Sequence, residues 1–439
     1  MKLRTIIIAG MSGAAASGSI IAYAAGPARQ SVDEENLRYV QRQFEEGKKI
    51  FRYETFGSEA FWGDALQLHK AIAGEKNGGV GPGVSPKTAL SVGLKVDADA
   101  LPNSLKKQLA AGKVNLDDPA TTIALLKLNA VVGVTAFANP DGSVKGMGIQ
   151  CAFCHSTVDD SFAPGIGKRL DGWAARDLNV GAIVSLAPDL KPFTDLLGVD
   201  VDTVKKVLAS WGPGRFDAEL DKDGKALRPD GKQAGTLIPP AFGLAGVNLH
   251  TWTGFGSVPY WNAYVGATEM HGAGTFFDAR LNDKEQYPVA AKSGSGNTRG
   301  TPDRITSKLA ALHLYQLSIP APKAPAGSYD KAAFERGRTV FNGPAKCATC
   351  HVPPLFTEPG ENLHTPDEIG VDSFQADRSP THKYRTAPLA GLWTHQKGGF
   401  YHDGRFATLP DVVDHYDTQF KLNLSSSQKS DLVEYLKGI

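Results

Sequence analysis

Four cysteines and two histidines form the most chemically informative pattern in this sequence. They stand in two copies of a Cys-x-x-Cys-His motif, at 151–155 and at 347–351. Two thiols three positions apart can each form a thioether with one haem vinyl group, and the histidine that follows them can bind the iron. The spacing predicts two covalently attached haem c groups. Their predicted attachment residues are Cys151, Cys154, Cys347 and Cys350, with His155 and His351 as the proximal iron ligands.

A zinc site or a pair of redox dithiols is the alternative interpretation of these motifs. The two complete motifs use every cysteine in the chain, which favours haem attachment and leaves no thiol for a disulfide. The chain has 439 residues, enough for two or three domains. Its 47 basic and 46 acidic residues give no signal for a nucleic acid or a membrane surface as a partner.

Residues 1–24 have the pattern of a secretory signal peptide. Lys2 and Arg4 precede a mostly apolar run that ends at the small-x-small site Ala22-Tyr23-Ala24. An uncleaved membrane anchor is the alternative, because the run approaches the length of a membrane span. No later stretch is long and apolar enough to cross a membrane, so no stable span is expected after cleavage. Because bacteria attach c-type haem outside the cytoplasm, the prediction is a periplasmic or secreted bacterial protein.

The expected fold class is mostly α, with two cytochrome c-like haem domains, long irregular loops and a small β-hairpin. The turn Asn139-Pro140-Asp141-Gly142 predicts the hairpin, just before the first motif. A stiff linker with Pro320, Pro322 and Pro325 marks a domain boundary. It separates an N-terminal haem domain with Gly/Pro- and aromatic-rich extensions, 25–325, from a C-terminal cytochrome c domain, 326–439. Helical patterns are expected at 33–56, 58–73, 199–211, 305–317 and 332–341.

Three side chains near the C-terminus compete to be the second ligand of the iron at His351. They are His402, His415 and Tyr416. Thr408 and Asp411 resemble a capping box, so a helix is expected from Leu409 onward. Tyr416 falls on the apolar face of that helix, His415 falls away from its centre, and His402 precedes it on a loop with a glycine turn.

The stretch Tyr401-His402-Asp403-Gly404, followed by Thr408-Leu409 and Val412–Tyr416, resembles the C-terminal signature of bacterial di-haem peroxidases and their MauG-like relatives. Arg385–Leu389 fits the same pattern, and the likeness covers most of 326–439. In the N-terminal part the resemblance is mainly the haem motif. The wide spacing between the motifs and the aromatic stretch Thr251–His271 are similar to the di-haem rubber-oxygenase branch of that superfamily.

The resemblance implies a division of labour between the two haems. The N-terminal haem meets peroxide or dioxygen, with His155 and His271 as the candidate catalytic residues and His271 as a displaceable cap. The C-terminal haem passes electrons from a small redox protein. MauG-like relatives have a tyrosine ligand near the position of Tyr416, whereas the rubber-oxygenase branch has a histidine, so Tyr416 and His402 are both candidate metal ligands, with Tyr416 favoured. An aromatic residue between the haems is also implied, for which Trp173 and Trp211 are candidates.

Two function classes, and a weaker third, remain open from the sequence. The first is an exported di-haem oxidoreductase, peroxidase-like or oxygen-activating. The second is a non-enzymatic periplasmic electron carrier in which both irons are fully ligated, and the third is a haem-based sensor. Beyond the signal region only Met147 and Met270 could supply a methionine ligand of the kind common in carriers, which favours the enzyme. The aromatic stretch Thr251–His271 could line a haem crevice or a substrate pocket, or could be ordinary core.

Overall fold

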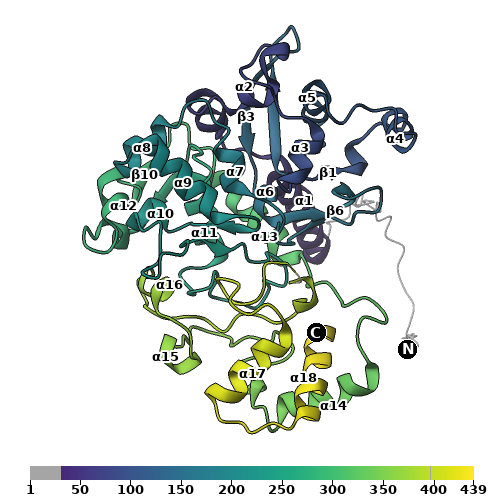
Figure 1. The fold of residues 1–439 in the computed structure, drawn as a ribbon, viewed down its shortest axis with the longest axis vertical. Coiled ribbons are helices and arrows are strands. Elements are labelled where there is room, and N and C mark those ends of the chain that lie inside the picture. Colours follow the sequence, from purple (N-terminus) through teal and green to yellow (C-terminus); the bar gives the residue numbers. More distant parts are fainter. Residues whose placement is uncertain (1–30, 396) are drawn as a thin grey trace, which may run out of the picture. The chain divides into compact units, whose positions relative to one another are not determined.

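The computed structural model describes residues 31–395 and 397–439 (Figure 1). The predicted signal peptide, 1–24, lies outside the described residues. The chain divides into two compact units, 1–41 and 42–439, and both cysteine motifs lie in the second. Among the described residues, no helix combines the length and the apolar character needed to cross a bilayer.

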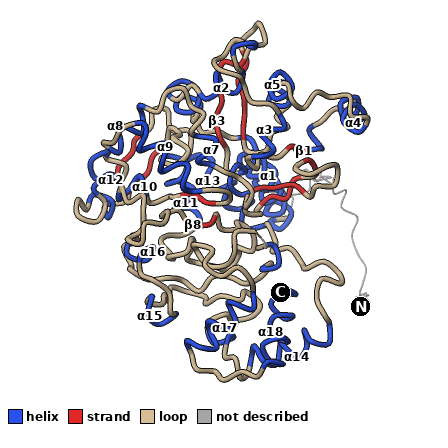
Figure 2. The backbone as a smooth tube through the Cα atoms, viewed as in Figure 1, coloured by secondary structure: helices blue, strands red, loops and turns tan. Residues whose placement is uncertain are grey.

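Helices joined by long loops make up most of the described residues, as expected for a mostly α protein (Figure 2). Before the first motif they are α1 (Val32–Tyr53), α2 (Leu68–Ala73), α3 (Pro86–Ser91), α4 (Asn103–Ala110) and α5 (Pro119–Lys127). From the first motif to Ser318 they are α6 (Ala152–His155), α7 (Val180–Val184), α8 (Lys191–Leu197), α9 (Val201–Trp211), α10 (Leu220–Asp223), α11 (Val258–Ala267), α12 (Pro288–Ser293) and α13 (Leu309–Ser318). The last are α14 (Lys331–Asn342), α15 (Pro366–Ile369), α16 (Phe374–Asp377), α17 (Leu409–Gln419) and α18 (Ser426–Gly438).

The strands of the described residues form short pairs and no large sheet. The antiparallel pairs are β2 (Val134–Ala138) with β3 (Val144–Ile149), β4 (Ser156–Val158) with β6 (Arg169–Asp171), β7 (Arg215–Phe216) with β8 (Thr236–Leu237), and β9 (Thr275–Phe277) with β10 (Asn297–Arg299). The parallel pair is β1 (Val96–Asp97) with β5 (Ile166–Gly167). The short 3-10 helices are η2 (Glu75–Asn77), η3 (Ala98–Ala100), η4 (Ala279–Asn282), η5 (Thr306–Lys308), η6 (Cys347–Thr349) and η7 (Leu392–Thr394).

The expected hairpin is present and lies against the first motif. Strands β2 and β3 pair with Val134 opposite Ile149. Just before β2, Gly133 has a φ of +83°, and a Cβ added there would lie 2.2 Å from the Cα of Phe153. Only glycine allows this approach, because any side chain would collide with the motif backbone. The hairpin is therefore part of the support of helix α6.

The prediction of a single helix over 58–73 is wrong in one respect. The segment forms a π-helix, η1 (Ala60–Ala65), followed by the separate helix α2. The break is at Gln67, which adopts the left-handed conformation with φ 55°. Packing against the hairpin and the core outweighs the helical pattern here. The π-helix directs Phe61 and Trp62 toward the segment around His271.

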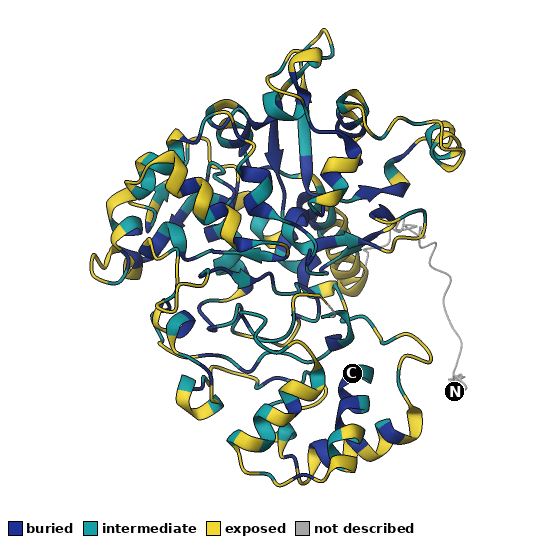
Figure 3. Cartoon of the chain, viewed as in Figure 1, coloured by how far each residue is buried: buried dark blue, intermediate teal, exposed yellow. Residues whose placement is uncertain are grey.

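The region that carries the second motif has its own small hydrophobic core. Val340 and Phe341 of α14 pack with Leu432 and Leu436 of α18, and Cys347 borders this core. Figure 3 shows both helices with buried segments in dark blue. The two helices approach closely at Gly337, where an added Cβ would lie 2.0 Å from the Asp431 carbonyl oxygen. Helix α17 begins with the expected capping box, in which Thr408 and Asp411 bind each other's backbone N–H groups.

Candidate functional site

The first cysteine motif forms a helical turn that carries both thiols and the histidine. Helix α6 begins directly after Cys151, and both Cys151 and Cys154 are free thiols. Burial raises the pKa of each thiol to about 12. Reactive and redox-active cysteines have lowered pKa values instead, so the surroundings of these thiols do not favour a redox dithiol.

A backbone carbonyl orients the ring of His155. Its Nδ1 lies 3.2 Å from the carbonyl oxygen of Pro239, so Nδ1 carries the proton and donates to that oxygen. Burial lowers the pKa of His155 to about 4, which keeps the ring neutral at physiological pH. A neutral imidazole held in this way offers Nε2 to a metal, as metal-ligating histidines commonly do.

The second motif gives its histidine the same hydrogen bond on a different local structure. Cys347 opens the 3-10 turn η6, and burial raises its pKa to about 12. The Nδ1 of His351 lies 3.0 Å from the carbonyl oxygen of Phe356 and donates to it. Burial also lowers the pKa of His351. Both motifs therefore hold a neutral histidine that has Nε2 available, which is what an iron ligand needs.

Among the described residues, neither motif brings both of its cysteines together with other potential metal ligands. Two groups of three potential ligands converge within 4.8 Å of one another, Cys350–Glu358–His364 and Asp372–His402–Asp403, and neither contains two cysteines. Both nitrogens of His364 are already engaged, at 2.6 Å by Glu358 and at 2.7 Å by Glu368. In the other group, Arg405 and Arg228 neutralise the two aspartates.

Several buried nitrogen atoms have no hydrogen-bond partner among the described residues. Three belong to arginines that form no ion pair with a described carboxylate, and burial lowers the pKa of Arg176 and of Arg385 to about 10. A buried cation without an anion is costly, so these atoms indicate that an acidic group completes the interior. The two propionates of a haem are such groups, and the residues present therefore fit a haem. Among the unpartnered atoms are Nε of Arg176, Arg215 and Arg385, Nε1 of Trp211 and Nε2 of His402.

The three candidates for the second ligand at His351 differ in their surroundings. Burial raises the pKa of Tyr416 to about 12, and the thiols of Cys347 and Cys350 contribute to that rise, so the phenol lies beside the second motif. His415 is tied down, because its Nε2 lies 2.9 Å from the Ile369 carbonyl oxygen and donates to it.

His402 is instead hydrogen-bonded to the segment that supports His155. The N–H of Leu237 donates to the carbonyl oxygen of His402 at 2.7 Å, and Pro239, two residues further on, accepts the hydrogen bond from His155. The His402 ring is only 3% exposed and stacks on Tyr384 with centroids 5.1 Å apart. These contacts favour Tyr416 over His402 as a group that faces the second motif.

His271 and a neighbouring carboxyl group lie near the first motif. The His271 ring stacks on Phe61 with centroids 3.5 Å apart and an interplanar angle of 13°, and burial lowers its pKa to about 4. Two residues earlier, the Oε1 of Glu269 is buried without a hydrogen-bond partner. Burial raises the pKa of Glu269 well above its usual value, and its negative charge contributes to the raised pKa of Cys154. Sequence reasoning missed Glu269, whose only signal was an acidic residue at the end of an aromatic stretch.

Aromatic side chains of the stretch Thr251–His271 pack together as core. Their rings surround the ammonium of Lys222, which is fully buried and lies 5.3, 5.1 and 4.9 Å from the centroids of Phe255, Trp261 and Tyr264. Glu219 neutralises this ammonium at 2.8 Å. The alternative of ordinary core is therefore the one favoured, with cation–π contacts added to it.

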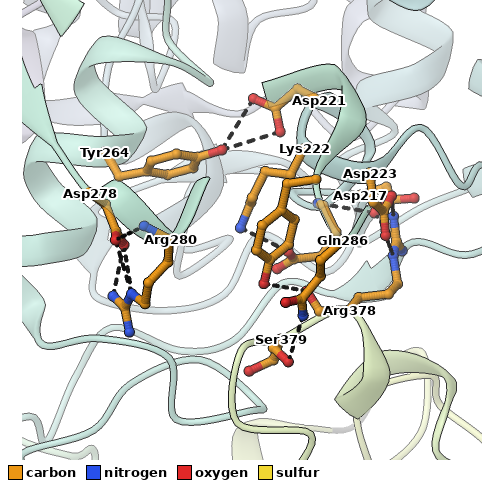
Figure 4. Close-up of polar contacts among 12 residues, drawn as sticks. Asp217, Asp221, Lys222, Asp223, Tyr264, Asp278, Arg280, Gln286, Arg378 and Ser379 are labelled. Atoms are coloured by element: carbon orange, nitrogen blue, oxygen red, sulfur yellow. Dashed lines mark hydrogen bonds and ion pairs between the residues drawn. The ribbon is translucent and has the colours of Figure 1, made fainter. Parts of the chain in front are cut away.

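A buried ion cluster joins this core to the C-terminal part of the chain (Figure 4). Arg378 is 1% exposed and lies between Asp217, at 2.9 Å, and Asp223, at 2.7 Å. Burial raises the pKa of Asp217 to about 6 even with this arginine beside it. The guanidinium thus compensates two carboxylates that water does not reach.

Replacing Arg378 by methionine is expected to destabilise the protein strongly. The substitution leaves Asp217 and Asp223 buried without a counter-charge, and removal of one partner from such a pair costs about 3–5 kcal/mol. Urea unfolding at pH 7 measures the effect. Arg336→Met is the matched control, since Arg336 pairs with Asp431 at 2.7 Å but its side chain is 61% exposed, and it should cost no more than about 1 kcal/mol. Equal losses in the two variants would contradict a buried role for Arg378.

Trp173, one of the two tryptophans suggested as an electron relay, contacts a residue that is distant in the sequence. Trp173 forms a T-shaped contact with Trp393, with centroids 5.3 Å apart. The residue before it, Gly172, donates its N–H to the carbonyl oxygen of His155 at 2.8 Å. Trp211 remains in the core against Phe216. The relay itself stays a prediction, and this geometry makes Trp173 the stronger candidate.

Comparison with known proteins finds a relative with a similar sequence. The methylamine utilization protein MauG of Methylorubrum extorquens is 27% identical to this chain over 153 residues. The match spans 30% of this chain and 43% of MauG, less than half of that relative's length. The chain is thus similar to MauG and, through it, to the di-haem cytochrome c peroxidase superfamily. No family model matches the sequence.

Two solved structures are similar to parts of this chain. A MauG-like protein associated with microbial copper homeostasis has a TM-score of 0.32 and 18% identity, covering 52% of this chain and 78% of its own. Kuenenia stuttgartiensis hydrazine synthase has a TM-score of 0.27 and 20% identity, covering 48% and 75%. Both scores are below 0.5, so the arrangement of this chain rests on its own residues.

Proposed function

We propose that this chain is an exported di-haem c-type cytochrome that acts as an oxidoreductase on peroxide or dioxygen. Haems are attached at Cys151 and Cys154, and at Cys347 and Cys350. The observation that carries the proposal is the shared state of His155 and His351, each neutral and holding a backbone carbonyl through Nδ1. Bound haem supplies an iron that can exchange electrons and bind a small ligand.

The two sites are proposed to have different tasks. At the first, His271 covers the site and Glu269 holds a proton at its unpartnered carboxyl, which suits acid–base chemistry. His271 has no ring hydrogen bond among the described residues, so it can be displaced without breaking one. At the second, Tyr416 is the proposed second iron ligand, and a small redox protein is the proposed electron partner. The two sites belong to proposed domains 25–325 and 326–439.

Rapid mixing of the haem-loaded protein with hydrogen peroxide tests this function. The expected result is a fast change in the haem absorption spectrum of the oxidised or the half-reduced protein, since the first site can open. Reduction by a small donor protein should then restore the starting absorption spectrum. No spectral change with peroxide in either state would contradict the oxidoreductase and favour the electron carrier, in which both irons keep their protein ligands.

Export to the periplasm is proposed from residues 1–24. The basic Lys2 and Arg4, the apolar run and the site at Ala22-Tyr23-Ala24 support it, and free cysteines that form no disulfide agree with haem attachment there. The mass of the mature chain tests the proposal, since it should lack the first 24 residues or nearly so.

A further inference from the structure

A small cavity lies beside the first cysteine motif. Helices α2, α3, α5 and α7 and the hairpin β2–β3 enclose it, and its volume is about 50 Å³. Phe153, which stands between the two cysteines of the motif, forms one wall. Trp62 forms another. A cavity of this volume holds one very small molecule.

The lining of this cavity is apolar and offers a water molecule few hydrogen-bond partners. Its polar lining residues are Thr122 and Lys95. The Lys95 ammonium donates to Asp177 at 3.0 Å, and the buried Thr122 hydroxyl has no hydrogen-bond partner in the part of the chain that the structure describes. A buried water usually makes about three hydrogen bonds, and apolar cavities with fewer polar partners stay dry. The cavity therefore suits a small apolar molecule better than water.

Trp62 connects the cavity to the residues proposed to face the reactive site. Its Nε1 donates to the carbonyl oxygen of Met270 at 3.0 Å, between Glu269 and His271 in the chain. Its neighbour Phe61 packs edge-on against the Trp62 ring and stacks on the ring of His271. One tryptophan side chain thus borders the cavity on one side and the segment 269–271 on the other.

A second, larger cavity adjoins the first and reaches the surface. It has a volume of about 290 Å³ and lies between α3, α4 and α5. Pro86, Leu90, Val96 and Leu125 line both cavities, so these four side chains are the partition between them. Gln108, which is exposed, stands at its outer side. Both cavities are mostly apolar, and only these four side chains separate the outer cavity from the inner one at the first motif.

We propose that the inner cavity binds dioxygen and that the outer cavity is its access route to the first motif. Dioxygen is small, apolar and needs no hydrogen bonds, so it matches the volume and the lining. Hydrogen peroxide, which is polar, would lose its hydration along this route and gain at most the Thr122 hydroxyl. Delivery to a reactive haem rests on the proposed function, whereas binding of the gas does not.

Crystals of the haem-loaded protein pressurised with xenon test the binding. Xenon should appear in the inner cavity of the wild type and disappear in Ala89→Leu, because Ala89 is buried in the cavity wall and the larger side chain fills the space. Ala110→Leu, at an exposed position on the neighbouring helix α4, should keep the xenon. Ordered water on Thr122, or no xenon in the wild type, would overturn the proposal. If Ala89→Leu does not fold, the isosteric variant Thr122→Val is used instead. A dry cavity should still bind xenon in this variant, whereas a cavity that holds water should lose that water with the Thr122 hydroxyl.

The rate of dioxygen binding to the reduced protein tests the delivery. Ala89→Leu should slow it several-fold and leave the rate with hydrogen peroxide unchanged, while Ala110→Leu should alter neither. Xenon binding with an unchanged dioxygen rate in Ala89→Leu would overturn the access route. Xenon binding in a protein that reacts with neither oxidant would contradict the proposed function and leave the gas site standing.

Discussion

Glu269→Gln is expected to slow the reaction of the haem-loaded protein with hydrogen peroxide by about 10²–10⁴-fold, the usual contribution of a positioned acid–base group. The Oε1 of Glu269 is buried and has no hydrogen-bond partner among the described residues, and burial holds the pKa of Glu269 well above its usual value. Such a carboxyl can hold a proton and transfer it, whereas the amide that replaces it cannot. Rapid mixing with peroxide at several concentrations gives the second-order rate constant.

Glu285→Gln is the control for this substitution. Glu285 also follows α11 in the chain, but it is exposed. Its rate constant should equal that of the wild type. Both variants must carry the same haem content, which the absorption spectrum reports. A Glu269→Gln protein with full haem content and an unchanged rate would remove Glu269 from the acid–base role.

Tyr416→Phe is expected to convert the haem at His351 from a low-spin to a high-spin ferric state. The hydroxyl is the only atom that the substitution removes, and it lies beside Cys347 and Cys350 in a position where burial raises the pKa to about 12. A phenol with that pKa stays neutral near pH 7 unless a cation such as iron binds the oxygen. Electron paramagnetic resonance of the oxidised protein separates the two spin states.

Two further variants make the assignment specific. Tyr401→Phe removes the neighbouring phenol, whose ring centroid is 6.0 Å from that of Tyr416, and should leave the spin state alone. His402→Ala should do the same, because His402 is tied to the segment that supports His155. If His402→Ala produced the high-spin signal and Tyr416→Phe did not, the ligand role would pass to His402.

Local patterns predicted the elements whose signals lie within a few residues. The capping box at Thr408 and Asp411 and the hairpin around Asn139–Gly142 both form as expected, because each is specified by contacts inside its own segment. The break at Gln67 was missed, since the helical pattern continues through it and only tertiary packing produces the left-handed residue.

Some residues of the candidate site could likewise be predicted from local sequence, and others could not. The spacing of the two motifs alone predicts the attachment residues, and that assignment stays a prediction. Glu269, Arg176 and Arg385 were not distinguishable from other charged residues, because what marks them is a buried polar atom without a hydrogen-bond partner among the described residues. The aromatic stretch was ambiguous for a related reason, since a cage around Lys222 depends on a lysine that is distant in the sequence.

The intact mass of the exported protein, made in a host that attaches c-type haem and denatured in acid before analysis, tests the central claim most directly. The predicted result is a chain without its first 24 residues that carries the mass of two haems, and that retains one haem when Cys347 and Cys350 are both replaced by alanine. A chain with one haem or none, or haem that acid extracts freely, would contradict the account, and a mass that still includes Met1 would contradict cleavage of the signal peptide.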